Sequence, residues 1–234
     1  MIEFSLFWSY TRYMCGRYLL DEADQIAPRF HVEDWDEAEL KSNYNVAPTQ
    51  TMPVITMSED GKPQIEMMQW GITRFFGKDA KKMLINTRAD KAFGGFWKKT
   101  VCSRRCLIPA NGFYEWKGSA GNKVPYFIHP KNEKLFAFAG IWDTWKNNNG
   151  QEIKTYSIMT TEPNTEMRTI HNREPVMLHR EDESSWLEPT NDSQSVLERL
   201  LYPYEDNGLE IYEISRDVNA VKNNNPKLFL PLSN

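Results

Sequence analysis

The stretch Arg105-Cys106-Leu107-Ile108-Pro109-Ala110-Asn111-Gly112-Phe113-Tyr114-Glu115-Trp116 indicates the type of fold most clearly. Its apolar, branched and aromatic residues favour an extended strand. Similar strand-like runs follow at residues 126–129, 135–142 and 154–161. Residues 51–57 and 64–70 are predicted to pair as a hairpin around the polar turn between them. The chain is therefore expected to be rich in β-strands.

Helices are predicted between these strands. They are expected at residues 21–30, 32–40 and 165–170, and as a helical pair around Pro189 at residues 182–201. Residues 45–50 are predicted to form a loop, because Pro48 disfavours a helical conformation of the residue before it. Asn223 is predicted to begin a loose tail. With no long linker or repeat, the sequence predicts a single α+β domain with a mostly antiparallel, barrel-like β-sheet core and inserted and flanking helices.

Composition narrows the functional class. The 234 residues are 40% hydrophobic and include 8 Trp, 10 Tyr and 12 Phe, which is enough for a substantial core. A net charge of −4 argues against binding nucleic acid through overall charge, but leaves room for a local basic groove. Three cysteines, an odd number, favour a reducing compartment. Without a membrane-length apolar run or a signal-like N-terminus, the protein is expected to be cytoplasmic, with no metal or cofactor.

Cys15 directly follows an internal methionine, Met14. If translation starts at Met14 and that residue is removed, Cys15 carries a free α-amine beside its thiol. Such a 1,2-aminothiol condenses with an aldehyde to an imine and then closes to a thiazolidine. The amine titrates near pH ~7.7 and the thiol near ~8.5, so both are partly available at neutral pH. The alternative is a small buried hydrophobic residue at a strand start, as many free cysteines are.

Glu115 and His171 are candidates for proton transfer. Glu115 lies among aromatic residues, an environment that raises a carboxyl pKa and suits a general acid. His171 precedes Arg173 by two residues and titrates in the neutral range. Each also has a simple structural interpretation, as a solvated strand end and as a hydrogen-bonded histidine respectively. Cys102 and Cys106 lack further ligands for a metal site and are expected to be structural.

Asn86 and Arg88 alternate along Ile85-Asn86-Thr87-Arg88, so an extended backbone would direct both to the same side. An amide and a guanidinium together suit a phosphodiester or a nucleophile's amine. A turn asparagine and a surface arginine would give the same pattern. Trp70 and Trp116 could stack on nucleobases, although aromatic residues at strand spacing also build cores.

These features occur in the order that is typical of the SRAP (SOS response-associated peptidase) domain. The chain resembles this domain from about Met14 to Asn225. The motifs that carry the resemblance are Met14-Cys15-Gly16-Arg17-Tyr18, Asn45-Val46-Ala47-Pro48-Thr49, Trp70-Gly71, Asn86-Thr87-Arg88-Ala89, Arg105-Cys106-Leu107-Ile108-Pro109, Gly112-Phe113-Tyr114-Glu115-Trp116, Phe138-Ala139-Gly140-Ile141-Trp142 and His171-Asn172-Arg173-Glu174-Pro175-Val176. Val218-Asn219 near the end also fits.

The resemblance implies a protein that senses abasic sites in single-stranded DNA and cross-links to them. Cys15 would supply the amine and thiol of a thiazolidine that shields the lesion. Asn86 would hold that amine, Glu115 would act as acid and base for ring opening and imine formation, and His171 would assist proton transfer on the sugar. The family name also implies a cysteine peptidase activity, either on other proteins or limited to removal of the residues before Cys15.

The resemblance further implies DNA-binding roles for five residues. Arg17, Arg88 and Arg173 would grip the phosphates that flank the lesion. Trp70 and Trp116 would stack against bases or wedge between them. A monomer that associates with the nucleoid when bound to DNA is expected.

Two departures from the family pattern affect these expectations. Residues 1–13 precede Met14 and are interpreted either as the result of a translation start placed too far upstream or as a propeptide. The domain is expected at residues 14–234. While they remain attached, the nitrogen of Cys15 is an amide and cannot form an imine. Glu174 occupies a position that is usually apolar, and its charge is expected to weaken one phosphate contact of Arg173. A cysteine peptidase or amidohydrolase and a non-covalent single-strand binder are the alternative functions.

Overall fold

The computed structural model describes residues 16–33, 35, 40–76, 80–119, 121–147 and 149–232. Met14 and Cys15 lie outside this set, as does most of the second half of the helix predicted at residues 32–40. Among the described residues, no helix is long and apolar enough to cross a membrane.

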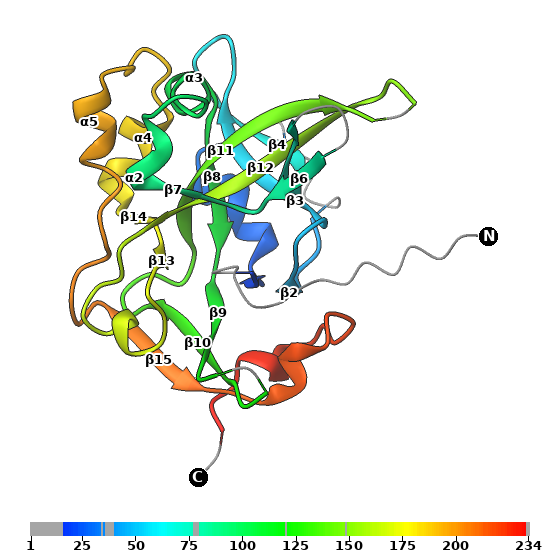
Figure 1. Ribbon diagram of the computed structural model, residues 1–234, viewed down its shortest axis with the longest axis vertical. Helices are drawn as coiled ribbons and strands as arrows, with labels where there is room; N and C mark the ends of the chain where they lie inside the picture. The colour runs from blue at the N-terminus through cyan, green and yellow to red at the C-terminus, as the bar shows by residue number, and fades with distance from the viewer. Residues whose placement is uncertain are drawn as a thin grey trace.

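A closed ring of five strands forms the centre of the fold (Figure 1). In order around the ring these are β12 (Glu152–Thr161), β4 (Pro63–Trp70), β3 (Thr51–Met57), β8 (Arg105–Ala110) and β11 (Phe136–Lys146). Neighbours are antiparallel except β12 and β4, which run parallel. The pairing of β11 with β12 closes the ring. The predicted α+β fold with a mostly antiparallel, barrel-like core is confirmed.

The barrel interior is filled by apolar side chains from all parts of the ring, as the alternation of a closed sheet requires. Every residue of β8 is buried, and Ile55, Phe138 and Ile158 are among the fully buried side chains. Gly140 of β11 lies under a branched side chain, since a Cβ there would be 2.2 Å from the Cδ1 of Ile108. A side chain at residue 140 would therefore displace part of the core.

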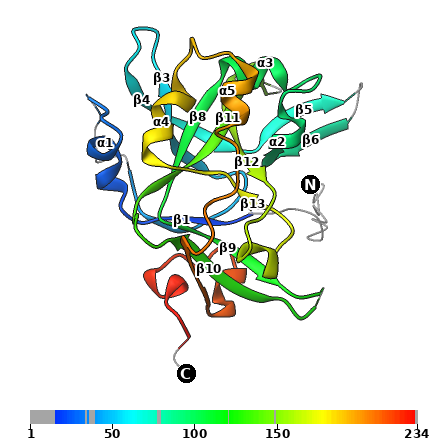
Figure 2. The ribbon, with the colours of Figure 1, turned by 90° about the vertical axis from the view of Figure 1, so that its left-hand side faces the viewer.

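A second, fully antiparallel sheet lies against one end of the barrel (Figure 2). Its strands, in order, are β15 (Leu209–Glu213), β10 (Val124–Pro130), β9 (Gly112–Lys117), β1 (Tyr18–Leu20) and β2 (Asn43–Val46).

The strand predicted at residues 105–116 is in fact two strands, one in each sheet. The break falls at Asn111, whose side-chain oxygen accepts a hydrogen bond from the backbone N–H of Asp21 (2.8 Å) and whose amide donates to the carbonyl of Lys134 (2.7 Å). These tertiary bonds hold the bend, so the apolar pattern alone did not reveal it.

Short helices and minor strands cover the barrel. The helices are α1 (Ile26–Arg29), α2 (Ala89–Ala92), α3 (Lys98–Ser103), α4 (Arg180–Leu187) and α5 (Gln194–Glu198), with 3₁₀ turns at Ala23–Gln25, Met167–Thr169, Arg216–Asn219 and Pro226–Phe229. The remaining strands are β5 (Ile72–Phe76), β6 (Ala80–Leu84), β7 (Asn86–Arg88), β13 (Glu174–Pro175) and β14 (Met177–Leu178). The helix predicted at residues 165–170 is thus only a 3₁₀ turn, whereas the helical pair around Pro189 is present.

Two segments that were predicted to be irregular are held in place by tertiary contacts. Residues 45 and 46 belong to strand β2 rather than to a loop. The tail predicted to be loose is anchored there, because the side-chain oxygen of Asn224 accepts from the backbone N–H of Tyr44 (2.7 Å) and Asn45 donates to the carbonyl of Asn223 (2.9 Å). Hydrogen bonds between residues so far apart in the chain leave no local signature in the sequence.

Glu174 is a buried structural residue. Its carboxylate accepts hydrogen bonds from the backbone N–H groups of Asn164 (2.9 Å) and Tyr204 (2.6 Å), and the residue is 0% exposed. The expectation that its charge weakens a phosphate contact of Arg173 is wrong, because the carboxylate is engaged inside the protein. Burial raises the pKa of Glu174 to about 7, although the two N–H donors act in the opposite direction.

This raised pKa predicts a specific pH dependence of stability. Because the folded state favours the protonated carboxyl, the contribution of Glu174 to the free energy of unfolding is largest below about pH 4.5 and falls as pH rises to about 7. Glu174→Gln should abolish this change of the free energy of unfolding with pH. The difference between wild type and variant should therefore change by on the order of 1–3 kcal/mol across the window, in urea unfolding experiments at several pH values.

Glu213→Gln, on an exposed residue of β15, is the matched control and should leave the slope unchanged. A wild-type-to-Glu174→Gln difference that stays constant with pH would show that folding does not raise the pKa of this carboxyl.

Candidate functional site

Strand β12 brings two of the predicted DNA-binding arginines to one place. Strand β7 pairs with β12 in parallel, which sets Asn86 opposite Ile158 and Arg88 opposite Thr160. Arg173 lies just before β13, and its Nη2 donates to the carbonyl oxygen of Thr160 (2.7 Å). Two segments that are 85 residues apart in the chain thus meet at the same residue of β12.

Asp90 joins the two guanidinium groups. Arg88 donates from Nε to Oδ1 (2.9 Å) and from Nη2 to Oδ2 (2.5 Å), and Nη1 of Arg173 lies 3.6 Å from Oδ1. The Arg88 side chain is 57% exposed, whereas that of Arg173 is 14% exposed. Burial lowers the pKa of Arg173 and the like charge of Arg88 lowers it further, while Asp90 acts in the opposite direction. Both arginines stay charged, so they form a candidate anion-binding pair.

His171 lies two residues before Arg173 and is partly buried. Its Nδ1 is buried, and no described residue forms a hydrogen bond with it. Burial lowers the pKa of the imidazole and the positive charge of Lys123 adds to this, while the backbone of Arg173 offsets part of the effect. A neutral imidazole at neutral pH can accept a proton. Because Lys123 lies in the turn between β9 and β10, His171 lies near that hairpin.

Glu115 and Trp116 come from β9. Glu115 is 4% exposed, and its Oε2 accepts a hydrogen bond from the backbone N–H of Trp116 (3.3 Å). Trp116 is only partly buried, and its Nε1 donates to Oδ1 of Asn219 (2.8 Å) in the 3₁₀ turn near the C-terminus. This bond fixes one edge of the indole at the molecular surface.

The first described residues of the chain run along β9. Tyr18 pairs with Phe113, and the backbone N–H of Tyr114 donates to the carbonyl of Arg17 (3.0 Å). One further step of this antiparallel register would set Gly16 opposite Glu115. The N-terminal strand therefore leads toward the buried carboxylate. Cys15, the predicted nucleophile, lies outside the described residues.

Arg17 is placed differently from the expectation. Its side chain is inside the protein at 5% exposure, and Nη1 donates both to Oδ1 of Asn45 (2.8 Å) and to the carbonyl of Val218 (2.9 Å). A guanidinium held in this way is not presented to a DNA strand at the surface. The phosphate role expected for Arg17 is therefore wrong, and the residue instead joins β1, β2 and the C-terminal segment.

Trp70 is also a core residue. It is 0% exposed, its Nε1 donates to the carbonyl of Ile85 (2.9 Å), and its ring packs against Tyr18 and Tyr156 with centroid distances of 5.2 and 6.2 Å. A base can stack only on a ring with an accessible face. The stacking role predicted for Trp70 is therefore wrong.

The remaining predicted residues lie on three parts of the structure. Asn86 and Arg88 share β7, Arg173 contacts β12 at the residue opposite Arg88, and Glu115 and Trp116 lie on β9, in the hairpin whose Lys123 lowers the pKa of His171. Sequence reasoning missed three neighbours of these residues: Asp90, Lys123 and Asn219. Only Asp90 left a local signal, because it lies two residues after Arg88. Among the described residues, no group of His, Cys, Asp or Glu side chains is arranged to hold a metal ion.

These features define the class as an α+β barrel domain that carries a pair of neighbouring arginines, a partly buried histidine and a buried glutamate on the strand next to its first strand. Comparison with known families gives the particular case. The chain belongs to the SOS response associated peptidase (SRAP) family, whose model matches residues 14–221.

Individual relatives agree with this assignment. The abasic site processing protein YoqW of Bacillus subtilis (strain 168) is 39% identical over 222 residues, covering 92% of this chain and 98% of that protein. The abasic site processing protein HMCES of Gallus gallus is 28% identical, covering 84% and 68% respectively. A crystal structure of a protein from Bacteroides thetaiotaomicron superposes with a TM-score of 0.79 at 26% identity, covering 94% of this chain and all of the other.

The different burial of the two tryptophans predicts different effects on stability. Trp70→Phe removes a buried hydrogen bond and leaves a cavity, so the free energy of unfolding should fall by about 2–4 kcal/mol. Trp116→Phe should cost less than about 1.5 kcal/mol, because the ring is partly exposed and only the bond to Asn219 is lost. Urea unfolding measures both values. Equal costs would contradict the assignment of Trp70 to the core and Trp116 to the surface.

Proposed function

We propose that this protein recognises abasic sites in single-stranded DNA and forms a covalent thiazolidine cross-link through Cys15 when that residue is N-terminal. Membership of the SRAP family and the names of its abasic site processing relatives support this function. The observation that carries it is the register of β1 on β9, which leads the chain from Arg17 toward Glu115.

DNA binding in this proposal is local. Arg88 and Arg173 bind phosphates on the two sides of the lesion through charge-assisted hydrogen bonds. Trp116, which is partly exposed, stacks on a neighbouring base. The net charge of −4 makes such a site necessary, because the protein as a whole does not attract a polyanion.

The cross-linking step requires proton transfers that the site residues can perform. Opening of the abasic sugar to its aldehyde needs one group that donates and one that accepts a proton, and Glu115 and His171 fill these roles. The lowered pKa of His171 keeps its imidazole ready to accept. Asn86 holds the amine of Cys15 in position.

The bonds change in two stages. The amine nitrogen forms a bond to the aldehyde carbon and the carbonyl oxygen leaves as water, which gives an imine. The thiolate then adds to the same carbon, and the nitrogen takes up a proton. The resulting five-membered ring hydrolyses less readily than an open imine, so the product protects the strand instead of cutting it. Residues 1–14 must be absent, because the nitrogen of Cys15 is otherwise an amide and cannot form the imine.

Intact-mass measurement tests the cross-link directly. A protein that begins at Cys15 should gain the mass of one abasic-site oligonucleotide less one water. Cys15→Ala should form no adduct, and Cys15→Ser should form one poorly because a hydroxyl closes the ring less well. Cys102→Ala, which removes a partly exposed free thiol elsewhere, should react normally.

The form that begins at Met1 resolves the role of residues 1–13. Loss of residues 1–14 during preparation, abolished by Cys15→Ala, would assign self-cleavage to the same cysteine. A free N-terminal Cys15 that leaves abasic DNA unmodified would refute the cross-linking function.

The phosphate contacts predict the salt dependence of reversible binding. With an oligonucleotide that carries a non-reactive abasic analogue, Arg88→Ala should weaken binding and reduce the slope of log K against log salt concentration by roughly 0.7. Lys62→Ala, an exposed lysine of the β3–β4 turn, is the charge-matched control and should leave the slope unchanged. Equal slopes for wild type and Arg88→Ala would exclude a phosphate contact of Arg88.

A further inference from the structure

Asp90 occupies part of the surface that a phosphate would use. Its two carboxylate oxygens take the Nε–Nη2 edge of Arg88, at 2.9 and 2.5 Å. That edge is one of the forks through which arginine binds phosphate with two parallel hydrogen bonds. The same carboxylate is 3.6 Å from Nη1 of Arg173. An incoming phosphate must therefore displace Asp90 or bind next to its negative charge.

Asp90 has two opposing effects on such binding. It orders Arg88 and reduces the repulsion between two guanidinium groups, which favours binding. It also repels the phosphate and cancels half of the positive charge of the pair. The ordering effect is small, because Arg88 and Asp90 are 57% and 47% exposed and exposed ion pairs contribute little. The repulsion acts within a few ångströms, well inside the Debye length at physiological salt, so we expect it to dominate.

We propose that Asp90 is a specificity-determining residue that weakens reversible binding of Arg88 and Arg173 to undamaged single-stranded DNA, so that retention depends on the covalent bond to an abasic site. This inference rests on the proposed function and adds to it the way in which the protein avoids coating intact single strands. Weak reversible binding allows the protein to dissociate from undamaged DNA. Only the covalent thiazolidine makes the complex with an abasic site persist.

Asp90→Asn tests this idea with little change of shape, because the amide oxygen can still accept from Arg88 while the charge is lost. Its affinity for an undamaged single-stranded oligonucleotide should rise roughly three- to tenfold near 0.1 M salt. The slope of log K against log salt concentration should become steeper by up to about 0.7.

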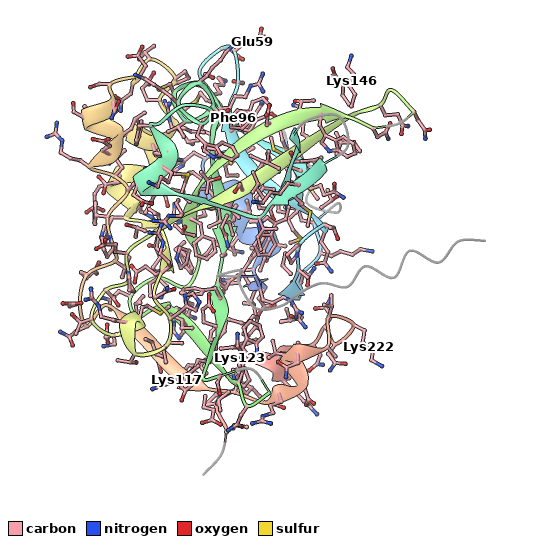
Figure 3. The ribbon with its side chains drawn as sticks, in the orientation of Figure 1. Glu59, Phe96, Lys117, Lys123, Lys146 and Lys222 are labelled. Atoms are coloured by element: carbon pink, nitrogen blue, oxygen red, sulfur yellow. The ribbon has the colours of Figure 1, made fainter. Side chains whose placement is uncertain are left out.

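Two control variants separate the local effect from others. Glu59→Gln makes the same change in net charge at an exposed residue of the β3–β4 turn, at the opposite end of the molecule from Lys117 and Lys123 of the β9–β10 hairpin (Figure 3), and should leave the affinity unchanged. In an Arg88→Ala background, Asp90→Asn should lose most of its effect, because the carboxylate acts on binding at that guanidinium.

The outcomes distinguish this inference from the proposed function. Unchanged or weaker binding of Asp90→Asn to undamaged DNA would overturn the inference and leave Asp90 as a residue that only orders Arg88. The binding measurement needs no chemistry of Cys15. A wild-type protein with a free N-terminal Cys15 that forms no adduct would therefore refute the cross-linking function, while the effect of Asp90 on reversible binding stays measurable.

Discussion

The hydrogen bonds of strand β12 hold the barrel closed and also position the candidate site. One side of β12 pairs with β11 over Gly140–Ile158 to Lys146–Glu152, and its other partners are β4, β7 and β13. Strand β7 carries Arg88, and strand β13 begins directly after Arg173. Because β7 and β13 are too short to be stable by themselves, the geometry of the arginine pair depends on a strand that the barrel already fixes.

Burial decides the role of the acidic residues near this pair. Glu174 directly follows Arg173 in sequence, yet its carboxylate caps two backbone N–H groups inside the protein, and its pKa is raised to about 7. Asp90 is half exposed and stays at the surface beside both guanidinium groups, where the hydrogen bonds from Arg88 lower its pKa. The residue that is adjacent in the chain is thus structural, while Asp90, which is distant from Arg173 in sequence, is the carboxylate that lies beside both guanidinium groups.

Burial also separates residues of the same type into structural residues and candidate site residues. Arg17 is enclosed by Asn45 and the carbonyl of Val218, whereas Arg88 reaches solvent. Trp70 fills the core between two tyrosines, whereas Trp116 lies at the surface with its indole bonded to Asn219. The sequence motif around each residue resembles a functional motif in both cases. A motif fixes the residue type and its local conformation, but exposure results from the packing of distant segments.

The sequence by itself determined the strand-rich α+β class, the barrel-like core and the family, because strand periodicity and ordered motifs are local properties of the chain; it also named Asn86, Arg88, Glu115, Trp116, His171 and Arg173 as candidate site residues, whose roles stay predictions. Only the tertiary structure decided the bend at Asn111, the anchored C-terminal segment and the core positions of Arg17 and Trp70. It alone also brought Asp90 within reach of Arg173 and Lys123 near His171. Each of these depends on contacts between segments far apart in sequence, whose energies no local pattern encodes.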